Sequence, residues 1–345
     1  MKLTVKEIIK ETEEAVSVVL KPGLFSGKVK YKPGQFLTVK VPIADKIEKR
    51  AYSFSSCPVT DKFPRITVKK VEKGLVSTYI CNDLKVGQKI EVEKAAGSFF
   101  VDTDKDALHT YVLFAAGSGI TPIFSIAKAV LQNEPLSKVI LVYCNRDEKQ
   151  IIFKEALDKL SHAYPETFYV EHILEHPITT SNCHPGLLSA EVVEAIYDKF
   201  QLEFPDKKYM MCGPQGFMDK AKEILYDKGI TRDQIKLEAF ENSLITPSDA
   251  KDLQSTVVIF RDNIKESIQV RGDKTILQGA LANNITLPYS CRSGMCSSCK
   301  AKCVNGTVKM IDGHVMPQSE VDEGYILTCV SFPTSSSVAI SYLED

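Results

Sequence analysis

The stretch Tyr289-Ser-Cys291-Arg-Ser-Gly-Met-Cys296-Ser-Ser-Cys299 decides what the C-terminal part of this chain folds around. With Cys329 it gives the spacing C-x4-C-x2-C, a long gap and a fourth cysteine, which is the plant-type pattern for a [2Fe–2S] cluster. A short loop can wrap one side of such a cluster, and a distant strand end supplies the last thiolate. Small residues between the cysteines let backbone N–H groups turn toward sulfur and tune the reduction potential. The sequence therefore predicts four metal ligands: Cys291, Cys296, Cys299 and Cys329.

Two other uses of these cysteines fit the sequence less well. Disulfide frameworks are typical of short secreted chains, whereas this chain has 345 residues and an N-terminus without the apolar core of a signal peptide. A structural zinc site usually has two C-x2-C pairs, and only one is present. Cys303 fits a strand position and is not counted as a ligand. Ten cysteines in such a chain favour a reducing, cytoplasmic location.

The composition is that of ordinary globular domains. A net charge of −1, without a block of Lys or Arg, argues against binding of nucleic acid. No apolar run approaches the roughly 18 residues that cross a membrane, so we expect no membrane insertion. Tryptophan is absent, so aromatic stacking on a cofactor must come from Tyr or Phe. The six histidines show no metal-ligand spacing and fit surface positions.

The patterning along the chain predicts three domains in series. Short alternating strands with Pro-Gly turns predict a small antiparallel barrel over residues 1–103. Strands that alternate with helices predict a parallel sheet over 104–243, and after a linker at 244–252 the alternation returns in a cluster domain over 253–345. In the middle domain we expect strands at 111–116, 138–144, 167–174, 208–212 and 235–240, and helices at 117–132, 152–162, 189–200 and 216–228.

Two motifs place glycine at the start of a helix. Gly74-Leu-Val76-Ser77-Thr78 offers backbone N–H groups and hydroxyls to an anion, although Ser77 as an ordinary helix cap fits the same residues. Gly117-Ser-Gly119-Ile-Thr121-Pro122 follows an apolar strand, where a dinucleotide pyrophosphate can bind. Pro122 stands where the G-x-G-x-x-G fingerprint has its third glycine, so this signal alone is weak.

Two further motifs lie on strands. Arg50-Ala-Tyr52-Ser53 combines a planar cation suited to phosphate with an aromatic ring and a hydroxyl, but a polar strand with a core tyrosine gives the same pattern. Met211-Cys212-Gly213-Pro214 ends a strand at the side of the sheet where ligands bind. A small buried thiol is the plainer explanation of Cys212.

Taken together, these motifs resemble those of the ferredoxin–NADP⁺ reductase superfamily, and the resemblance covers nearly the whole chain. It is strongest to reductases with a C-terminal plant-type ferredoxin domain, such as those of phenylacetyl-CoA epoxidase, 3-ketosteroid 9α-hydroxylase and phthalate dioxygenase. The resemblance implies an antiparallel flavin-binding β-barrel, a parallel-sheet nucleotide-binding domain and a β-grasp ferredoxin domain. It also implies electron flow from NADPH or NADH through FAD to the cluster, and on to an oxygenase, hydroxylase or desaturase partner. FMN suits the flavin motifs equally, and a redox-sensing protein without sustained turnover is the alternative function.

The resemblance also assigns roles to residues. Arg50 would pair with the flavin phosphate, Tyr52 would lie against the flavin ring, and Ser53 would lie near its reactive nitrogen. Cys212 would lie beside the nicotinamide and Phe240 near the flavin, so the predicted catalytic set is Tyr52, Ser53, Cys212 and Phe240. The remaining expected contacts are with flavin for Val68, Lys69, Gly74, Val76 and Ser77, and with the nucleotide for Gly117, Gly119, Thr121, Pro122, Gly213 and Pro214.

The preference between nucleotides depends on Arg146, which follows the second strand of the middle domain. A basic residue there accepts a 2′-phosphate and favours NADPH, while the adjacent Asp147 leaves NADH open. The chain departs from the family pattern in two places: Glu175 stands where relatives often have serine, and Leu187 where they often have arginine. Both departures concern contacts with the nucleotide rather than the reaction.

Overall fold

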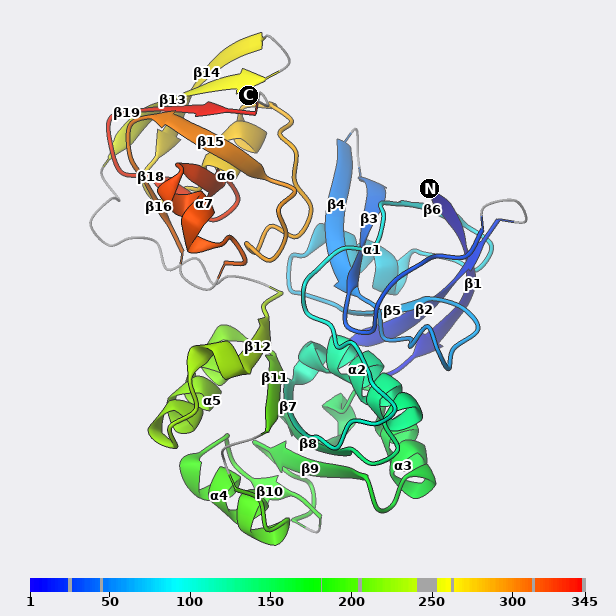
Figure 1. Ribbon diagram of the computed structural model, residues 1–345. Coiled ribbons are helices and arrows are strands. Elements are labelled where there is room, and N and C mark those ends of the chain that lie inside the picture. Colours follow the sequence, from blue (N-terminus) through cyan, green and yellow to red (C-terminus); the bar gives the residue numbers. More distant parts are fainter. Residues whose placement is uncertain are drawn as a thin grey trace. The chain divides into compact units, whose positions relative to one another are not determined.

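The computed structural model describes residues 1–23, 27–43, 46–180, 182–203, 207–240, 253–261, 264–311 and 314–342 (Figure 1). The chain forms two compact units, Met1–Phe240 and Glu241–Asp345. The predicted linker at 244–252 lies outside the described residues, and the domain boundary at 103/104 stays a prediction. None of the helices in the described ranges is both long and apolar enough to cross a membrane.

The N-terminal part of the first unit is an antiparallel sheet with strand order β4-β3-β6-β1-β2-β5. Alternate side chains of these strands form one apolar core. The two edge strands come together at one end, where Phe54 and Ile66 form an antiparallel bridge and the Ser55 N–H donates to the Arg65 carbonyl at 2.8 Å. The elements are β1 (Lys2–Lys10), β2 (Ala15–Pro22), β3 (Phe36–Ile43), β4 (Lys46–Ser53), β5 (Arg65–Lys69), α1 (Leu75–Asn82) and β6 (Lys89–Val92).

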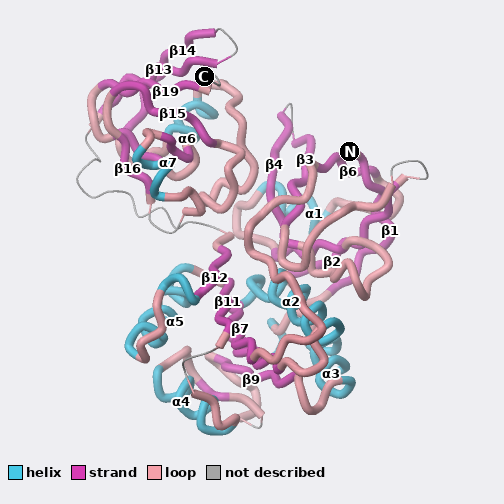
Figure 2. Tube along the Cα trace, viewed as in Figure 1, coloured by secondary structure: helices cyan, strands magenta, loops and turns pink. Residues whose placement is uncertain are grey.

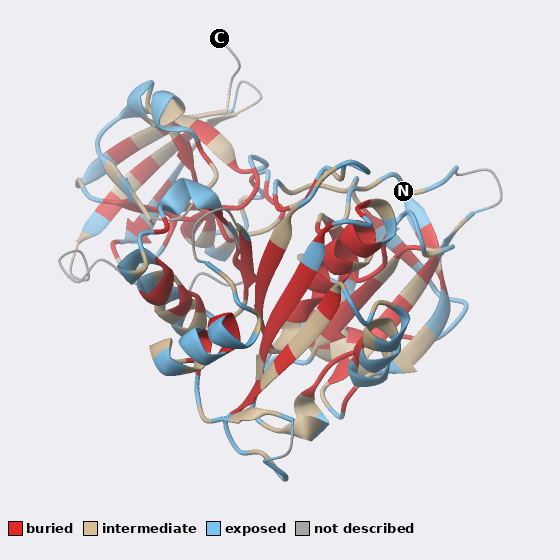
Figure 3. Cartoon of the chain, turned by 60° about the horizontal axis from the view of Figure 1, so that its bottom comes forward, coloured by how far each residue is buried: buried red, intermediate tan, exposed pale blue. Residues whose placement is uncertain are grey.

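The rest of the first unit is a parallel sheet with strand order β10-β9-β8-β7-β11-β12. Its strands are mostly buried (Figure 3), because apolar clusters that include α2 and α3 on one side and α4 and α5 on the other cover them. The elements are β7 (Thr110–Ala116), η1 (Gly117–Gly119), α2 (Ile120–Asn133), β8 (Lys138–Asn145), η2 (Glu148–Gln150), α3 (Lys154–Ala163), β9 (Phe168–Leu174), β10 (His184–Pro185), α4 (Ala190–Lys199), β11 (Lys208–Cys212), α5 (Gln215–Asp227), η3 (Arg232–Gln234) and β12 (Ile235–Glu238).

The alternation of strands and helices predicted for this part is confirmed (Figure 2). Two details differ. The last strand ends at Glu238, two residues before the expected end, and the short β10 was not expected. Because β10 pairs only with Ile173 and Leu174, residues 168–172 of β9 have no strand on their outer side within the described part of the chain.

The second unit is a mixed five-stranded sheet with order β14-β13-β19-β15-β17 and a separate pair, β16-β18. Its parallel pair β13-β19 lies between antiparallel neighbours, and α6 starts with a capping box of Thr275 and Gln278. The elements are β13 (Gln254–Arg261), β14 (Ile264–Arg271), α6 (Ile276–Ala282), β15 (Lys300–Asn305), β16 (Val308–Met310), α7 (Gln318–Asp322), β17 (Tyr325–Leu327), β18 (Ser331–Pro333) and β19 (Ser337–Ser341).

Candidate functional site

The last residues of β4 carry the first predicted motif. Ser53 is buried at 3% exposure, Tyr52 packs partly against the barrel core, and Arg50 keeps 37% of its side chain exposed. The Arg50 guanidinium donates to the Glu48 carboxylate at 3.2 Å and to the Lys49 carbonyl at 2.7 Å. Burial raises the pKa of Tyr52, against the opposing charge of Arg50, so the ring is neutral at physiological pH. A phosphate that binds Arg50 would compete with the Glu48 carboxylate for the guanidinium group.

The start of α1 forms the second predicted motif. Its N-cap is Gly74, so the alternative in which Ser77 caps this helix is wrong. The Ser77 hydroxyl accepts from the Val71 N–H at 3.1 Å and donates to the Gly74 carbonyl at 3.3 Å, which fixes the loop before the helix. A Cβ atom on Gly74 would lie 2.5 Å from the Ser77 oxygen, so the motif requires glycine here. Val76, also predicted here, is buried in the barrel core.

A cleft of about 410 Å³ opens at this helix start, lined by residues that include Pro42, Ile43, Lys73, Gly74 and Thr78. It combines exposed backbone at a helix N-terminus with one lysine, which is the chemistry that a pyrophosphate needs. The residues present therefore fit the phosphate portion of a flavin dinucleotide.

The third and fourth motifs lie in direct contact. A Cβ atom on Gly119 would lie 2.0 Å from the carbonyl oxygen of Cys212, so the turn before α2 packs on the end of β11 through bare backbone. Gly213 is also closely packed, because a Cβ there would lie 2.7 Å from the Phe217 ring and 3.0 Å from the Ala116 side chain. Gly117 has φ of +52° with open space around it, which suits the approach of a ligand. The two glycine motifs form one surface at the carboxyl ends of β7 and β11.

The other residues predicted to contact the nucleotide lie on the helices that begin at this surface. The Thr121 hydroxyl donates to the Ser118 carbonyl at 3.0 Å, Pro122 is buried in the first turns of α2, and Pro214 is the N-cap of α5. The turn Gly117–Gly119 also contacts β5, the strand that carries Val68 and Lys69. Barrel and nucleotide motifs therefore meet within one unit.

Cys212 is fully buried at the end of β11, opposite Ala115 on β7 and Glu238 on β12. Burial, and next the charge of Glu238, raise its pKa well above the usual value of a thiol. The side chain is thus a neutral thiol rather than a nucleophilic thiolate at neutral pH. Phe240, two residues beyond β12, packs partly against the apolar core of α2 and α3.

The raised pKa of Cys212 predicts a pH-dependent stability. Above about pH 8.5 the thiol ionises in the unfolded chain but not in the folded one, so the free energy of unfolding falls as the pH rises. Replacing Cys212 with serine removes this titration. When the pH is raised from 7.5 to 10, the free energy of unfolding measured in urea should fall by about 2 kcal/mol more for the wild type than for Cys212→Ser. Parallel pH profiles for the two proteins would contradict the assignment.

The nucleotide-side residues lie around the end of β8. Arg146 is exposed immediately after this strand, and its carbonyl accepts from the His176 N–H at 2.7 Å. The Glu148 carboxylate accepts from the backbone N–H groups of Ile178 and Thr179, which lower its pKa. Leu187 is 70% exposed. The Arg146 side chain is therefore accessible to a ligand, while the Glu148 carboxylate is hydrogen-bonded to the backbone at Ile178 and Thr179.

The four predicted metal ligands gather in the second unit. Cys296, Cys299 and Cys329 are buried and Cys291 is half-buried. Loop 289–299 reaches this geometry through left-handed backbone at Arg292 and Gly294, where a Cβ on Gly294 would press on His314 and Val330 at 3.2–3.3 Å. The Ser293 N–H points at the Cys291 sulfur at 3.4 Å, the type of contact expected to tune a cluster.

Contacts between sulfur atoms link the four cysteines: Cys291 with Cys296, Cys291 with Cys329, and Cys299 with Cys329. Hydrogen bonds from Cys296 and Cys329 lower the pKa of Cys291, and a hydrogen bond from Cys329 lowers that of Cys299. Among the described residues, no group of three or more His, Cys, Asp or Glu side chains is arranged to hold one metal ion. A binuclear cluster needs two thiolates on each iron, and the pairs Cys291–Cys296 and Cys299–Cys329 fit that donor set. Cys303 lies on a strand, β15, as predicted, and its thiol donates to the carbonyls of Asn305 and Gly306.

Sequence reasoning missed several polar residues that hold these motifs together. Tyr31 stacks on Phe54 with ring centroids 3.9 Å apart and shares a 2.6 Å hydrogen bond with Ser56. Ser125, on α2, donates to the Ser56 carbonyl at 2.6 Å. The only signal for Ser125 in the sequence is a lone hydroxyl within the apolar run Ile123-Phe-Ser-Ile-Ala.

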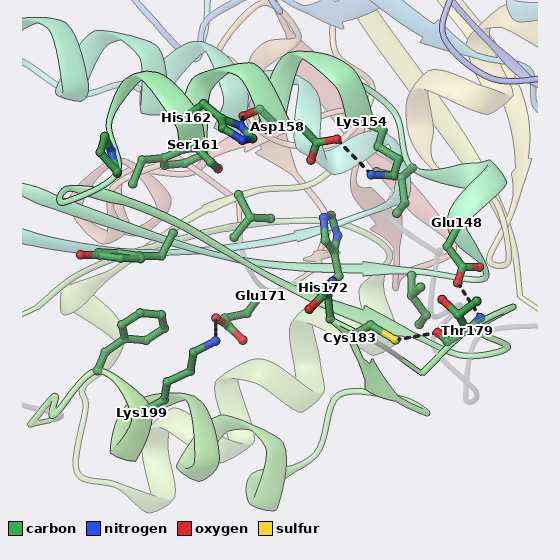
Figure 4. Close-up of a pocket in the computed structure, with 18 residues that line it drawn as sticks. Glu148, Lys154, Asp158, Ser161, His162, Glu171, His172, Thr179, Cys183 and Lys199 are labelled. Carbon is green, nitrogen blue, oxygen red and sulfur yellow. Dashed lines mark hydrogen bonds and ion pairs between the residues drawn. The ribbon is translucent and has the colours of Figure 1, made fainter.

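A second cleft, of about 800 Å³, lies beside β9 and α3 (Figure 4). On its floor the buried Glu171 carboxylate pairs with Lys199 at 2.6 Å and with His184 at 3.0 Å. The expectation of surface histidines is wrong for His172, whose buried Nδ1 has no hydrogen-bond partner within the described chain and whose pKa is lowered by burial. The described residues that line this cleft include none of the predicted site residues.

Comparison with protein families assigns three domains along the chain. The Oxidoreductase FAD-binding domain matches residues 1–101, the Oxidoreductase NAD-binding domain matches 113–223, and the 2Fe-2S iron-sulfur cluster binding domain matches 259–334. The order agrees with the three structural regions described above.

Among similar proteins is the ferredoxin reductase component of 3-ketosteroid-9-alpha-monooxygenase from Rhodococcus rhodochrous, which is 35% identical over 99% of this chain and 96% of its own. A component of the 1,2-phenylacetyl-CoA epoxidase of Escherichia coli (strain K12) is 29% identical over 99% of this chain and 97% of its own. Phthalate dioxygenase reductase shares the fold, with a TM-score of 0.67 at 23% identity over 99% of this chain and 97% of its own.

Proposed function

Since the chain belongs to the family of ferredoxin reductase components of monooxygenases, we propose that it passes electrons from NAD(P)H to an oxygenase. It is an oxidoreductase with FAD-binding, NAD-binding and 2Fe-2S domains. The observation that carries the proposal is the direct packing of Gly119 on Cys212, within the same unit as the flavin motif of β4. Two nucleotide motifs and a flavin motif converge there, as a hydride-transferring enzyme requires.

The roles of individual residues follow from their positions. When bound, FAD accepts a hydride with both electrons from the nicotinamide, and the electrons then leave singly through the cluster. Arg50 and the start of α1 would hold the flavin phosphates, and Tyr52 and Ser53 would face its ring. Gly117 would admit the pyrophosphate of the nucleotide, while the neutral thiol of Cys212 would border the nicotinamide and help to exclude water. Phe240 is assigned to the flavin side on the same basis.

The acceptor is assigned only as a class. Relatives of this chain serve a steroid monooxygenase and a phenylacetyl-CoA epoxidase, so an oxygenase, hydroxylase or desaturase fits the family. A cytoplasmic location is proposed because all ten cysteines are free thiols and four of them would hold a cluster.

Turnover separates a reductase from the alternative, a redox sensor. With NADPH or NADH, a reductase loaded with FAD and the cluster should reduce cytochrome c continuously. A sensor should reduce only as much cytochrome c as the electrons held by its own flavin and cluster allow, and then stop. Failure of both nucleotides to sustain reduction, in protein whose flavin and iron contents are full, would reject the proposed function.

Arg146 should set the preference between the two nucleotides. Its exposed guanidinium at the end of β8 is available to a 2′-phosphate, which only NADPH carries. Arg146→Ala should lower kcat/KM for NADPH about tenfold and leave that for NADH unchanged. Lys149→Ala, which removes an exposed charge three residues away, is the matched control. Equal losses with both nucleotides would contradict this role.

A further inference from the structure

The helix that starts at the nucleotide motif is tied to the flavin segment by a buried hydrogen bond. The Ser125 hydroxyl donates to the Ser56 carbonyl at 2.6 Å, and these residues are 0% and 1% exposed. Ser125 is one helical turn beyond Thr121, and Ser56 is three residues beyond Ser53. One bond therefore joins the two segments that are assigned to the nucleotide and to the flavin ring.

Ser56 is itself fixed from the barrel side. Its hydroxyl accepts from the Arg65 N–H at 2.8 Å and shares the 2.6 Å hydrogen bond with Tyr31. Arg65 in turn lies over the ring of Phe153, the residue that precedes α3, with its guanidinium carbon 5.3 Å from the ring centroid. Ser125 therefore binds a residue, Ser56, that hydrogen bonds within the barrel already fix in place.

A second anchor lies one turn further along the same face of α2. Lys128 forms an ion pair with Asp61, whose carboxylate also accepts from the Cys57 N–H at 2.6 Å. The Lys128 side chain is only 11% exposed. Burial lowers the pKa of Lys128 and the Asp61 charge opposes that effect, while the Asp61 side chain keeps 33% of its surface exposed. Ser125 and Lys128 therefore bind the two ends of loop 56–61, which follows the flavin motif.

We propose that Ser125 and Lys128 are positioning residues that fix the register between the nucleotide-binding turn and the flavin-contacting segment. This inference rests on the proposed function. A helix is a stiff element, so a shift at Ser125 moves the turn Gly117–Gly119 at its start. Hydride transfer is steep in distance, and a displacement of about 1 Å can cost about a hundredfold in rate.

The test compares two pairs of variants in the full-length protein. Ser125→Ala removes the hydroxyl, and its matched control is Ser255→Ala, because the buried Ser255 hydroxyl also donates to a backbone carbonyl at 2.6 Å but lies in the second unit. Lys128→Met removes the charge, and Lys128→Arg retains it. Flavin bleaching by NADPH and by NADH is followed by anaerobic stopped flow. Amide hydrogen exchange of residues 52–57 is measured in the FAD-free protein.

Ser125→Ala should lower the limiting rate of flavin reduction about tenfold, with the nucleotide Kd changed by less than about twofold. Exchange of residues 52–57 should become faster. Lys128→Met should act in the same direction, while Lys128→Arg and Ser255→Ala should match the wild type in both measurements. If Ser125→Ala does not fold, the Lys128 pair decides.

Wild-type rates in Ser125→Ala and Lys128→Met, or an equal slowing in Ser255→Ala, would overturn the positioning role and leave the proposed function intact. A wild-type flavin that neither nucleotide reduces would overturn both.

Discussion

Replacing Cys329 with alanine should abolish the cluster and, with it, the reduction of one-electron protein acceptors. Cys329 is buried, and it pairs with both Cys291 and Cys299, so its loss removes one ligand and disturbs both sulfur pairs. Iron and sulfide contents should fall to background, and NADPH-driven reduction of cytochrome c should fall with them. Reduction of ferricyanide, a small acceptor that takes electrons from flavin directly, should persist.

The matched control for this prediction is Cys303→Ala. Cys303 belongs to the same unit, and its thiol donates to the carbonyls of Asn305 and Gly306 rather than to another cysteine. This variant should keep its iron and its cytochrome c activity. A Cys329→Ala protein that retained a full cluster, or a Cys303→Ala protein that lost it, would show that the ligand set is wrong.

Gly119→Val should disable the nucleotide half of the enzyme. The first atom of any side chain at this position would lie 2.0 Å from the Cys212 carbonyl oxygen and 2.8 Å from the Gly213 nitrogen, both of them backbone atoms. The turn or the end of β11 must move, at a cost of about 3 kcal/mol in the free energy of unfolding. We expect flavin reduction by NADPH to be lost, while dithionite still reduces the cluster.

Gly216→Ala is the control for that substitution. Gly216 is in the first turn of α5, and a Cβ atom there would have nothing within 4 Å. Since alanine is favoured over glycine in a helix, this variant should be as stable as the wild type or more stable by about 0.5–1 kcal/mol. Normal nucleotide reduction in Gly119→Val would show that the close packing on Cys212 is not required.

The fold was largely predictable because its signals are local. The cysteine spacing at 291–299 gives the cluster domain, and the alternation of apolar strands with amphipathic helices gives the parallel sheet. Glycines at the starts of helices are likewise a local signal, and the two anion sites predicted from them rest on it.

What the sequence could not supply were contacts between distant segments. Nothing in the local pattern joins Ser125 to Ser56, 69 residues apart, or the turn at Gly119 to the backbone of Cys212. Such contacts arise from tertiary packing, which a periodicity analysis does not report.

Among the described residues, the short β10 leaves residues 168–172 of β9 without a neighbouring strand on their outer side, and Glu171 lies on that margin with its carboxylate buried against Lys199 and His184. An unpaired strand of this kind invites a strand from another molecule, and natural proteins discourage this with inward-pointing charge. If a β-strand from another molecule paired here and broke the Glu171 ion pairs, the Glu171 carboxylate would be buried without a partner. Glu171 and Lys199, which line the cleft, together with His184 thus disfavour the addition of a strand from another molecule at this margin.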